Sequence, residues 1–297
     1  MIERTPIVDA LTHAVLIGGL VILLLPVYIV VVAASHDIQA VNHVPMPLLP
    51  GSHLWENLVT AWQKGNFRNV MLTSIIVAGL VAAGKVAISA ISAYSIVYFD
   101  YRLRMVFFWV IFVTLMLPLE VRIVPTYAVA ANVLEPVQTL LDVAGVSLTL
   151  PRWNLLNSYS GLVLPLVATA TGTFLYRQFF MTIPDELTEA AKMDGAGGFR
   201  FFVDVILPLS VTNMAALGTV MFVYAWNQYL WPLLVVTDPN YATASMQLNR
   251  LVPSAAFGET PVWNTAMAGT LIVMLPPLVV VILLQRWFIR GLVASEK

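Results

Sequence analysis

Six long apolar stretches dominate the chain and restrict what it can fold into. A helix that crosses a bilayer needs about 20 mainly apolar residues, because the hydrocarbon core is about 30 Å thick. The stretches lie at residues 14–34, 70–98, 105–124, 155–176, 209–236 and 261–285. We therefore expect an all-α integral membrane protein with six transmembrane helices, and a single membrane domain over residues 1–297.

Composition excludes several other classes of function. Only 10% of the residues are charged and 59% are hydrophobic, whereas soluble domains have about 25% charged residues. The net charge of −1 provides no basic field for nucleic acid. The absence of cysteine excludes disulfides, thiol nucleophiles and thiolate metal sites. His36, His43 and His53 lack a compact metal-ligand spacing, so we expect no metal site and no nucleic-acid partner.

The first apolar stretch, residues 14–34, is expected to be a retained span. A signal-peptide core has about 7–15 apolar residues behind a basic leader, but this stretch is longer and follows Glu3, Arg4 and Asp9. Cleavage after the Val-Ala-Ala sequence at 32–34 remains an open alternative.

The distribution of Lys and Arg predicts that both termini face the cytoplasm. With the N-terminus inside, nine basic residues fall on the cytoplasmic side and five on the outer side. Basic residues accumulate in cytoplasmic loops. This orientation makes the polar segment 177–208 cytoplasmic.

The polar segment 177–208 contains a short helix with defined ends. Its start at residues 182–186 has a threonine hydroxyl to cap the helix, a proline in the first turn and two acids near the positive end of the helix dipole. We expect the helix to run to about Met193 and to stop at Asp194-Gly195, because glycine readily takes the left-handed conformation. A second short helix is expected over residues 198–206.

The surface of the first helix suits contact with another protein. Ala190 and Ala191 present almost no side chain, so a partner can approach the backbone closely, and Glu189 and Lys192 add charge at the rim. On composition alone, an amphipathic helix lying on the membrane surface is the alternative.

The same segment resembles a motif of a known transporter family. Glu189-Ala190-Ala191, the following Gly195 and Leu207-Pro208 resemble the EAA loop of binding-protein-dependent ABC importer permeases, with the same spacing. Val205 is the departure, because it stands where that pattern usually has isoleucine.

The resemblance extends along nearly the whole chain. Residues 226–233 are similar to the fifth-span signature of the carbohydrate-importer permeases, and residues 285–292 to their C-terminal ending. Residues 134–157 look like extra sequence in a loop that is short in those relatives. Three segments resemble the members of the family that import glycerol 3-phosphate: 117–122, 179–187 and 290–297.

This resemblance implies a type I ABC importer permease bundle, half of a heterodimeric translocation unit in a bacterial inner (cytoplasmic) membrane. The implied partners are a second related permease, two ATP-binding subunits and an external solute-binding protein. ATP and Mg²⁺ would be bound by partner subunits only, so we expect no cofactor and no catalytic residue in this chain. The implied solute is sn-glycerol 3-phosphate or a glycerophosphodiester, with a neutral sugar or polyol as the alternative. The residues that contact the ATPase would be Glu189, Ala190, Ala191, Asp194 and Gly195.

Lys85 is the one charge near the centre of an apolar stretch. An ammonium at this depth costs about 2.5–3.5 kcal/mol on insertion scales, and no acid lies near the midplane of another stretch. At helical spacing Lys85 shares a face with small or polar residues that suit a helix interface or a wet cavity. We expect Lys85 either to order a helix interface or to meet an anionic solute in the translocation path. The neighbours on its face are Ala78, Ala82, Ser89 and Ser92.

Four further residues are candidates for the solute path. Arg122, near the outer end of the third stretch with Glu120, suits bidentate binding of phosphate, although an interfacial anchor or ion-pair member is the alternative. Asn227, Gln228 and Trp231 lie in the fifth stretch, where polar groups need a partner from another helix or from a hydroxylated solute.

Two other functions and one nucleotide-binding pattern fit the sequence poorly. An ion-coupled secondary transporter would be expected to carry acids near the midplane, and a membrane scaffold would not need the cytoplasmic motif. Residues 79–85 match the nucleotide-binding pattern GxxxxGK, but Val86 replaces the Ser or Thr that holds Mg²⁺. We therefore expect no ATP site here.

Overall fold

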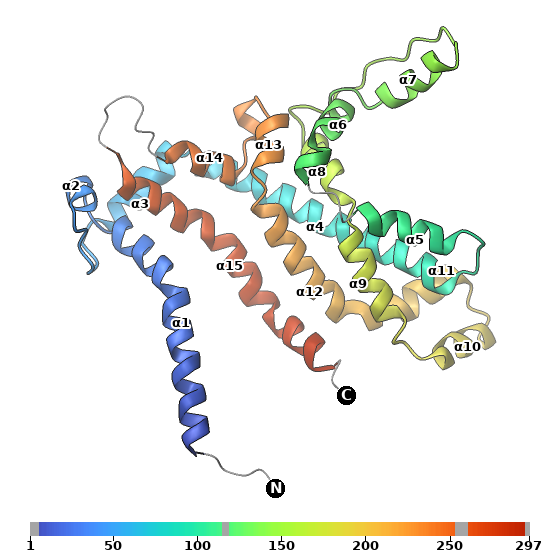
Figure 1. Cartoon of the computed structure of the whole chain (residues 1–297), viewed down its shortest axis with the longest axis horizontal. Helices are drawn as coiled ribbons and strands as arrows, with labels where there is room; N and C mark the ends of the chain where they lie inside the picture. Colours follow the sequence, from blue (N-terminus) through green and yellow to red (C-terminus); the bar gives the residue numbers. More distant parts are fainter. Residues whose placement is uncertain (1–5, 115–118, 253–260, 295–297) are drawn as a thin grey trace. The chain divides into compact units, whose positions relative to one another are not determined.

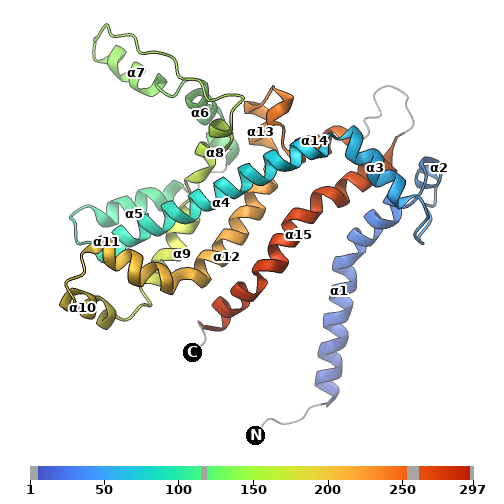
Figure 2. The ribbon, with the colours of Figure 1, turned by 180° about the vertical axis from the view of Figure 1, so that it is seen from behind.

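The structure is a computed structural model that describes residues 6–114, 119–252 and 261–294, drawn in Figures 1 and 2. Every regular element in these ranges is helical, which confirms the expected all-α class. Glu3 and Arg4, residues 115–118 of the third expected span and residues 295–297 lie outside the described residues.

Contacts between residues divide the chain into two compact units. One consists of Met1–Asn69 and Gln247–Leu275, and the other of Val70–Met246 and Pro276–Lys297. The two long helices α4 (Phe67–Tyr98) and α15 (Trp263–Ala294) and the short helix α14 (Ala244–Leu251) contribute residues to both.

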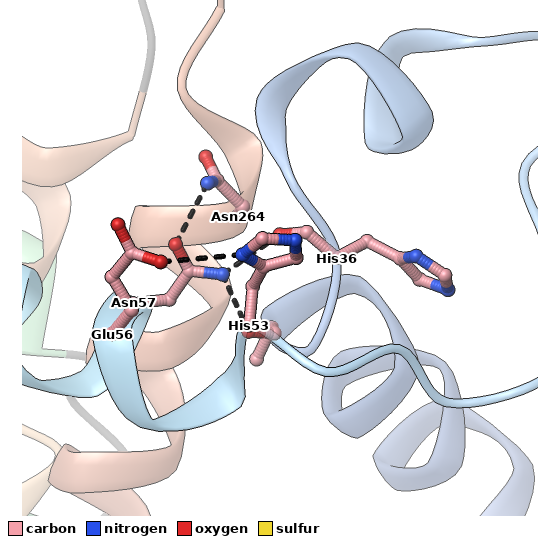
Figure 3. A network of polar contacts seen from close by, with 6 residues as sticks. His36, His53, Glu56, Asn57 and Asn264 are labelled. Carbon is pink, nitrogen blue, oxygen red and sulfur yellow. Dashed lines mark hydrogen bonds and ion pairs between the residues drawn. The ribbon is translucent and has the colours of Figure 1, made fainter.

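The first unit is organised by a buried asparagine. It contains α1 (Pro6–Ala34), α2 (Ile38–Asn42) and α3 (Leu54–Lys64). The Asn57 amide donates to the carbonyl oxygens of Ala34 at 2.8 Å and His36 at 2.7 Å, and its oxygen accepts from Asn264 at 2.9 Å (Figure 3). His53, the N-cap residue of α3, contacts Glu56 at 3.2 Å. Because its hydrogen bonds reach both the end of α1 and the start of α15, Asn57 ties α1, α3 and α15 to one another within this unit.

The second unit holds the remaining helices. The connection after α6 carries α7 as a separate short helix, and α10 and α11 follow α9. The bounds are α5 (Arg104–Val113), α6 (Leu119–Ala131), α7 (Glu135–Val143), α8 (Tyr159–Val167), α9 (Ala170–Phe180), α10 (Asp185–Met193), α11 (Gly198–Phe201), a π-helix (Phe202–Ile206), α12 (Leu207–Trp226), α13 (Leu230–Val235) and a 3₁₀ helix (Pro239–Tyr241).

Four described helices are long and apolar enough to cross a membrane, or five if α8 and α9 form one bent span. The first, second, fifth and sixth expected spans correspond to α1, α4, α12 and α15, and the fourth to α8 and α9. In the third, α5 and the start of α6 lie on either side of residues 115–118. Among the described residues α1 extends from Pro6, ahead of the apolar stretch that starts at residue 14.

Two spans expected to be continuous are broken. α8 ends at Val167, and residues 168 and 169 are extended. The bend between α8 and α9 is 47°. In the fifth span, α12 ends at Trp226 and α13 restarts at Leu230, because Pro232 has no N–H for the carbonyl of Gln228 and its ring crowds that carbonyl.

Small residues bring α4 close to α8 and α9 in the second unit. A Cβ added to Gly172 of α9 would lie 2.2 Å from the Ser89 hydroxyl of α4, and one on Gly84 of α4 would lie 2.9 Å from Val167. Ser89 is fully buried, as expected for a helix interface on the Lys85 face. Figures 1 and 2 both show α4, α9 and α12 side by side.

Candidate functional site

A cavity of about 480 Å³ lies within the second unit, and we call it the Lys85 cavity. Its walls come from α4, α5, α6, the α8–α9 break and α12. Lys85 and Arg122, two candidates from separate spans, both line it. None of its described lining residues is acidic, so the charge of these two cations is not balanced by the walls.

Lys85 is almost completely buried, with 5% of its surface exposed. Its Nζ lies 4.9 Å from the ring centroid of Tyr224 on α12, within the distance of about 6 Å at which a cation is attracted to an aromatic face. No pattern in the sequence indicated Tyr224, because this contact depends on how α4 and α12 pack.

Arg122 lines the same cavity from α6. Its Nε is buried and has no hydrogen-bond partner in the described ranges. The ion pairs found among those residues include neither Arg122 nor Lys85. Two cations that share one cavity raise each other's free energy, which makes the cavity receptive to an anion.

The α8–α9 break adds polar backbone to the cavity. Residues 168–171 line it, and Thr169, the N-cap of α9, makes no side-chain capping bond to the described residues. The first N–H groups of a helix have no partner inside the helix and carry partial positive charge. Sequence reasoning missed this feature, and the signal that could have indicated it was Pro165, two residues before the helix ends.

The fifth-span candidates lie outside the residues that line the cavity. Trp231 is fully buried, and its indole Nε1 donates to the carbonyl oxygen of Gly161 at 3.1 Å. Asn227 is exposed at the C-terminal end of α12, where its N–H donates to the Val223 carbonyl, and Gln228 is half-buried. The contacts of Trp231 thus tie α13 to α8.

The second candidate region is the coupling segment, residues 185–195. α10 occupies Asp185–Met193, and Gly195 follows with a φ of +71°, which confirms the expected glycine stop. The expected cap at Thr182 is wrong, because its hydroxyl donates back to the Phe179 carbonyl at 2.7 Å and Pro184 is the N-cap residue. The proline fixes an extended backbone there without a side-chain bond.

The second short helix expected over 198–206 is not separate. α11 passes through a π-helical turn, residues 202–206, directly into α12. Because no break intervenes, α11, the π-helical turn and α12 form one continuous helical backbone.

An aromatic cluster joins α4 to the segments on either side of the coupling segment. The Tyr94 hydroxyl donates to the Gly198 carbonyl at 2.7 Å, and the Tyr98 hydroxyl donates to the Phe180 carbonyl at 3.4 Å. The rings of Tyr94 and Phe202 lie 4.7 Å apart. This places α4, α9 and α11 in one packed group at the end of α4.

The coupling candidates divide between two faces of α10. Ala191 is half-buried against the aromatic cluster, whereas Glu189, Ala190, Asp194 and Gly195 are exposed. Met193 and Phe199 on either side of the turn are 88% and 83% exposed. The outer face thus offers small residues beside large apolar ones.

Comparison with known proteins identifies the family. The family described as "Binding-protein-dependent transport system inner membrane component" matches residues 75–293. Proteins named sn-glycerol-3-phosphate transport system permease protein UgpE are similar over the full length of both chains: 50% identical from Pectobacterium atrosepticum, 48% from Yersinia pestis and 46% from Escherichia coli O157:H7.

Solved structures share the fold. A chain of a bacterial ABC transporter involved in the import of the acidic polysaccharide alginate has a TM-score of 0.71 at 19% identity, covering 97% of this chain and 99% of the other. A chain from the alginate transporter in complex with an alginate pentasaccharide-bound periplasmic protein has a TM-score of 0.63 at 18% identity, covering 95% and 94%. The protein therefore belongs to the inner membrane components of binding-protein-dependent transport systems, and it is a permease subunit of an ABC importer rather than an enzyme.

Proposed function

We propose that this chain forms half of the translocation path of an importer for sn-glycerol 3-phosphate. The observation that carries the proposal is identity of 46–50% over the full length to permeases named for that solute. The whole chain acts as one permease domain, beside a second related permease, two ATP-binding subunits and an external solute-binding protein. A neutral sugar or polyol carried by the same machinery is the competing solute.

The coupling segment is the contact with one ATP-binding subunit. Its outer face carries Glu189, Ala190, Asp194 and Gly195, and Ala191 packs inward against the aromatic cluster. Closure of the ATPase on nucleotide moves α10, and the continuous backbone of α11 and α12 transmits that movement toward the cavity. In this arrangement both termini lie in the cytoplasm, in agreement with the excess of basic residues on that side.

Uptake by the reconstituted importer tests this function. The chain is purified with the second permease and the ATPases, placed in proteoliposomes with ATP on the ATPase side, and supplied with the binding protein and radiolabelled glycerol 3-phosphate. We expect ATP-dependent uptake that excess unlabelled glycerol 3-phosphate abolishes and that maltose or glycerol leaves unchanged.

Two results would contradict the proposal. Uptake of a neutral sugar in place of glycerol 3-phosphate would assign the solute to the other class. Uptake by this chain alone, driven by an ion gradient without ATPases, would make it a secondary transporter.

A further inference from the structure

Among the residues that the structure describes, Lys85 and Arg122 line one cavity without an acid, and their two charges favour a ligand of opposite charge. Lys85 is 5% exposed and Arg122 has a buried Nε without a partner among the described residues. The Lys85 ammonium lies over the aromatic face of Tyr224. An aromatic ring attracts a cation but carries no net charge, so it does not neutralise the ammonium. A helix-ordering role for Lys85 would not require a second cation at the same cavity.

The first turn of α9 supplies a third positive element. The chain is extended at Ala168 and Thr169, and the uncapped N-terminus of an 11-residue helix then opens on the cavity. Unpaired N–H groups at such an end bind phosphate and carboxylate oxygens. Irregular backbone at membrane depth is tolerated where it lines a cavity.

We propose that the Lys85 cavity is a phosphoryl-binding site in the translocation path, formed by Lys85, Arg122 and the first turn of α9. The Arg122 fork holds two phosphate oxygens, the Lys85 ammonium leaves the Tyr224 ring to pair with the third, and the α9 N–H groups complete the set. This assignment rests on the proposed function and deepens it, because it gives this chain its own solute contact.

The rest of the cavity fits a small hydroxylated solute. Ser92, Thr114 and Thr171 line it with hydroxyls that both donate and accept hydrogen bonds. The volume of about 480 Å³ lies within the range of roughly 300–1,000 Å³ typical of small-molecule sites. A monoester, whose phosphate carries nearly two negative charges, balances the two cations better than a diester with one.

Binding to the membrane complex itself tests the site. The whole permease–ATPase complex in lipid nanodiscs, without the external protein, is dialysed against radiolabelled glycerol 3-phosphate. We expect the wild-type complex to bind it, inorganic phosphate to compete and glycerol not to compete. Lys85→Met and Arg122→Met should each weaken binding at least about tenfold, because each removes a charge-assisted hydrogen bond.

Two variants separate loss of the site from damage to the bundle. Lys85→Arg keeps the charge and should bind within about threefold of wild type. Arg177→Met removes another cation of α9, whose guanidinium lies 4.6 Å from the Phe108 ring and which does not line the cavity, and it should leave the affinity unchanged. Competition by inorganic phosphate is measured on the wild-type complex, so it tests the site even if Lys85→Met misfolds.

Three results would overturn the site: unchanged affinity in both methionine variants, displacement of the label by glycerol as readily as by phosphate, or no binding by the wild-type complex at millimolar solute. The last result is distinct from failure of the proposed function, which the proteoliposome uptake assay decides separately.

Discussion

The Lys85 cavity and the coupling segment use buried polar groups in opposite ways. Around the cavity, Lys85 and Arg122 form no ion pair with described residues, and the start of α9 has no side-chain cap there. Beside the coupling segment, the Tyr94 and Tyr98 hydroxyls of the aromatic cluster donate to the backbone carbonyls of Gly198 and Phe180. Unpaired groups remain available for a ligand that comes and goes, whereas paired groups make a rigid connection.

The outer face of the coupling segment should give the largest effect. Gly195→Trp places a bulky side chain where the proposed ATPase contact lies, and a left-handed backbone costs a non-glycine residue about 1–2 kcal/mol. Within this chain a Cβ at Gly195 meets nothing within 4 Å. We expect membrane insertion to be retained, while solute transported per ATP hydrolysed falls at least tenfold in proteoliposomes.

Gly145 provides a matched control for that variant. Its φ is +73° and an added Cβ also meets nothing within 4 Å, but it follows α7, far from the coupling segment in sequence. Gly145→Trp should keep the wild-type ratio of transport to hydrolysis. Normal coupling in Gly195→Trp would remove the proposed ATPase contact.

A smaller effect is expected where Tyr224 covers Lys85. Tyr224→Leu removes the aromatic face and should reduce the free energy of unfolding. The reduction should be about 0.5–2 kcal/mol larger when Lys85 is present than when it is replaced in Lys85→Met. Tyr224→Phe keeps the ring and should lose much less. Denaturation in an SDS titration of the four variants of this double-mutant cycle measures the coupling, and strictly additive losses would show that the ring does not hold the ammonium.

The smallest effect is expected at the aromatic cluster. Tyr94→Phe removes one hydrogen bond of 2.7 Å to Gly198, worth about 0.5–1.5 kcal/mol, while the ring stays packed. Amide hydrogen exchange at residues 198–202 should become faster and solute transport less tightly coupled to ATP hydrolysis. Tyr98→Phe loses a longer hydrogen bond of 3.4 Å and should change the amide exchange rate less. Equal exchange rates in both variants and the wild type would show that these hydrogen bonds do not stiffen residues 198–202.

Much of the fold followed from local patterns in the sequence. The apolar stretches that became α1, α4, α12 and α15 were predictable because lipid demands long apolar helices. The coupling helix and its glycine stop were also predictable, since proline, acids and a left-handed glycine act within a few residues of one another. The break before Leu230 was missed although Pro232 was visible, because membrane helices often tolerate proline when neighbours satisfy the freed carbonyl.

The candidate sites were predictable only in part. The sequence singled out Lys85 and Arg122 separately, by an unpaired charge at depth and by a guanidinium at a span end. It could not indicate that both line one cavity with Tyr224 and the start of α9, nor that Trp231 bonds to Gly161. These relations join residues far apart in the chain.

The sequence by itself thus determined that this is a helical membrane protein with a short polar helix that ends at a left-handed glycine, because hydrophobic length and turn chemistry are local properties. Only the tertiary structure decided that two isolated cations and a broken helix share one space. That outcome depends on the close approach of α4 to α9 at Ser89 and Gly172, a packing relation that no local pattern encodes.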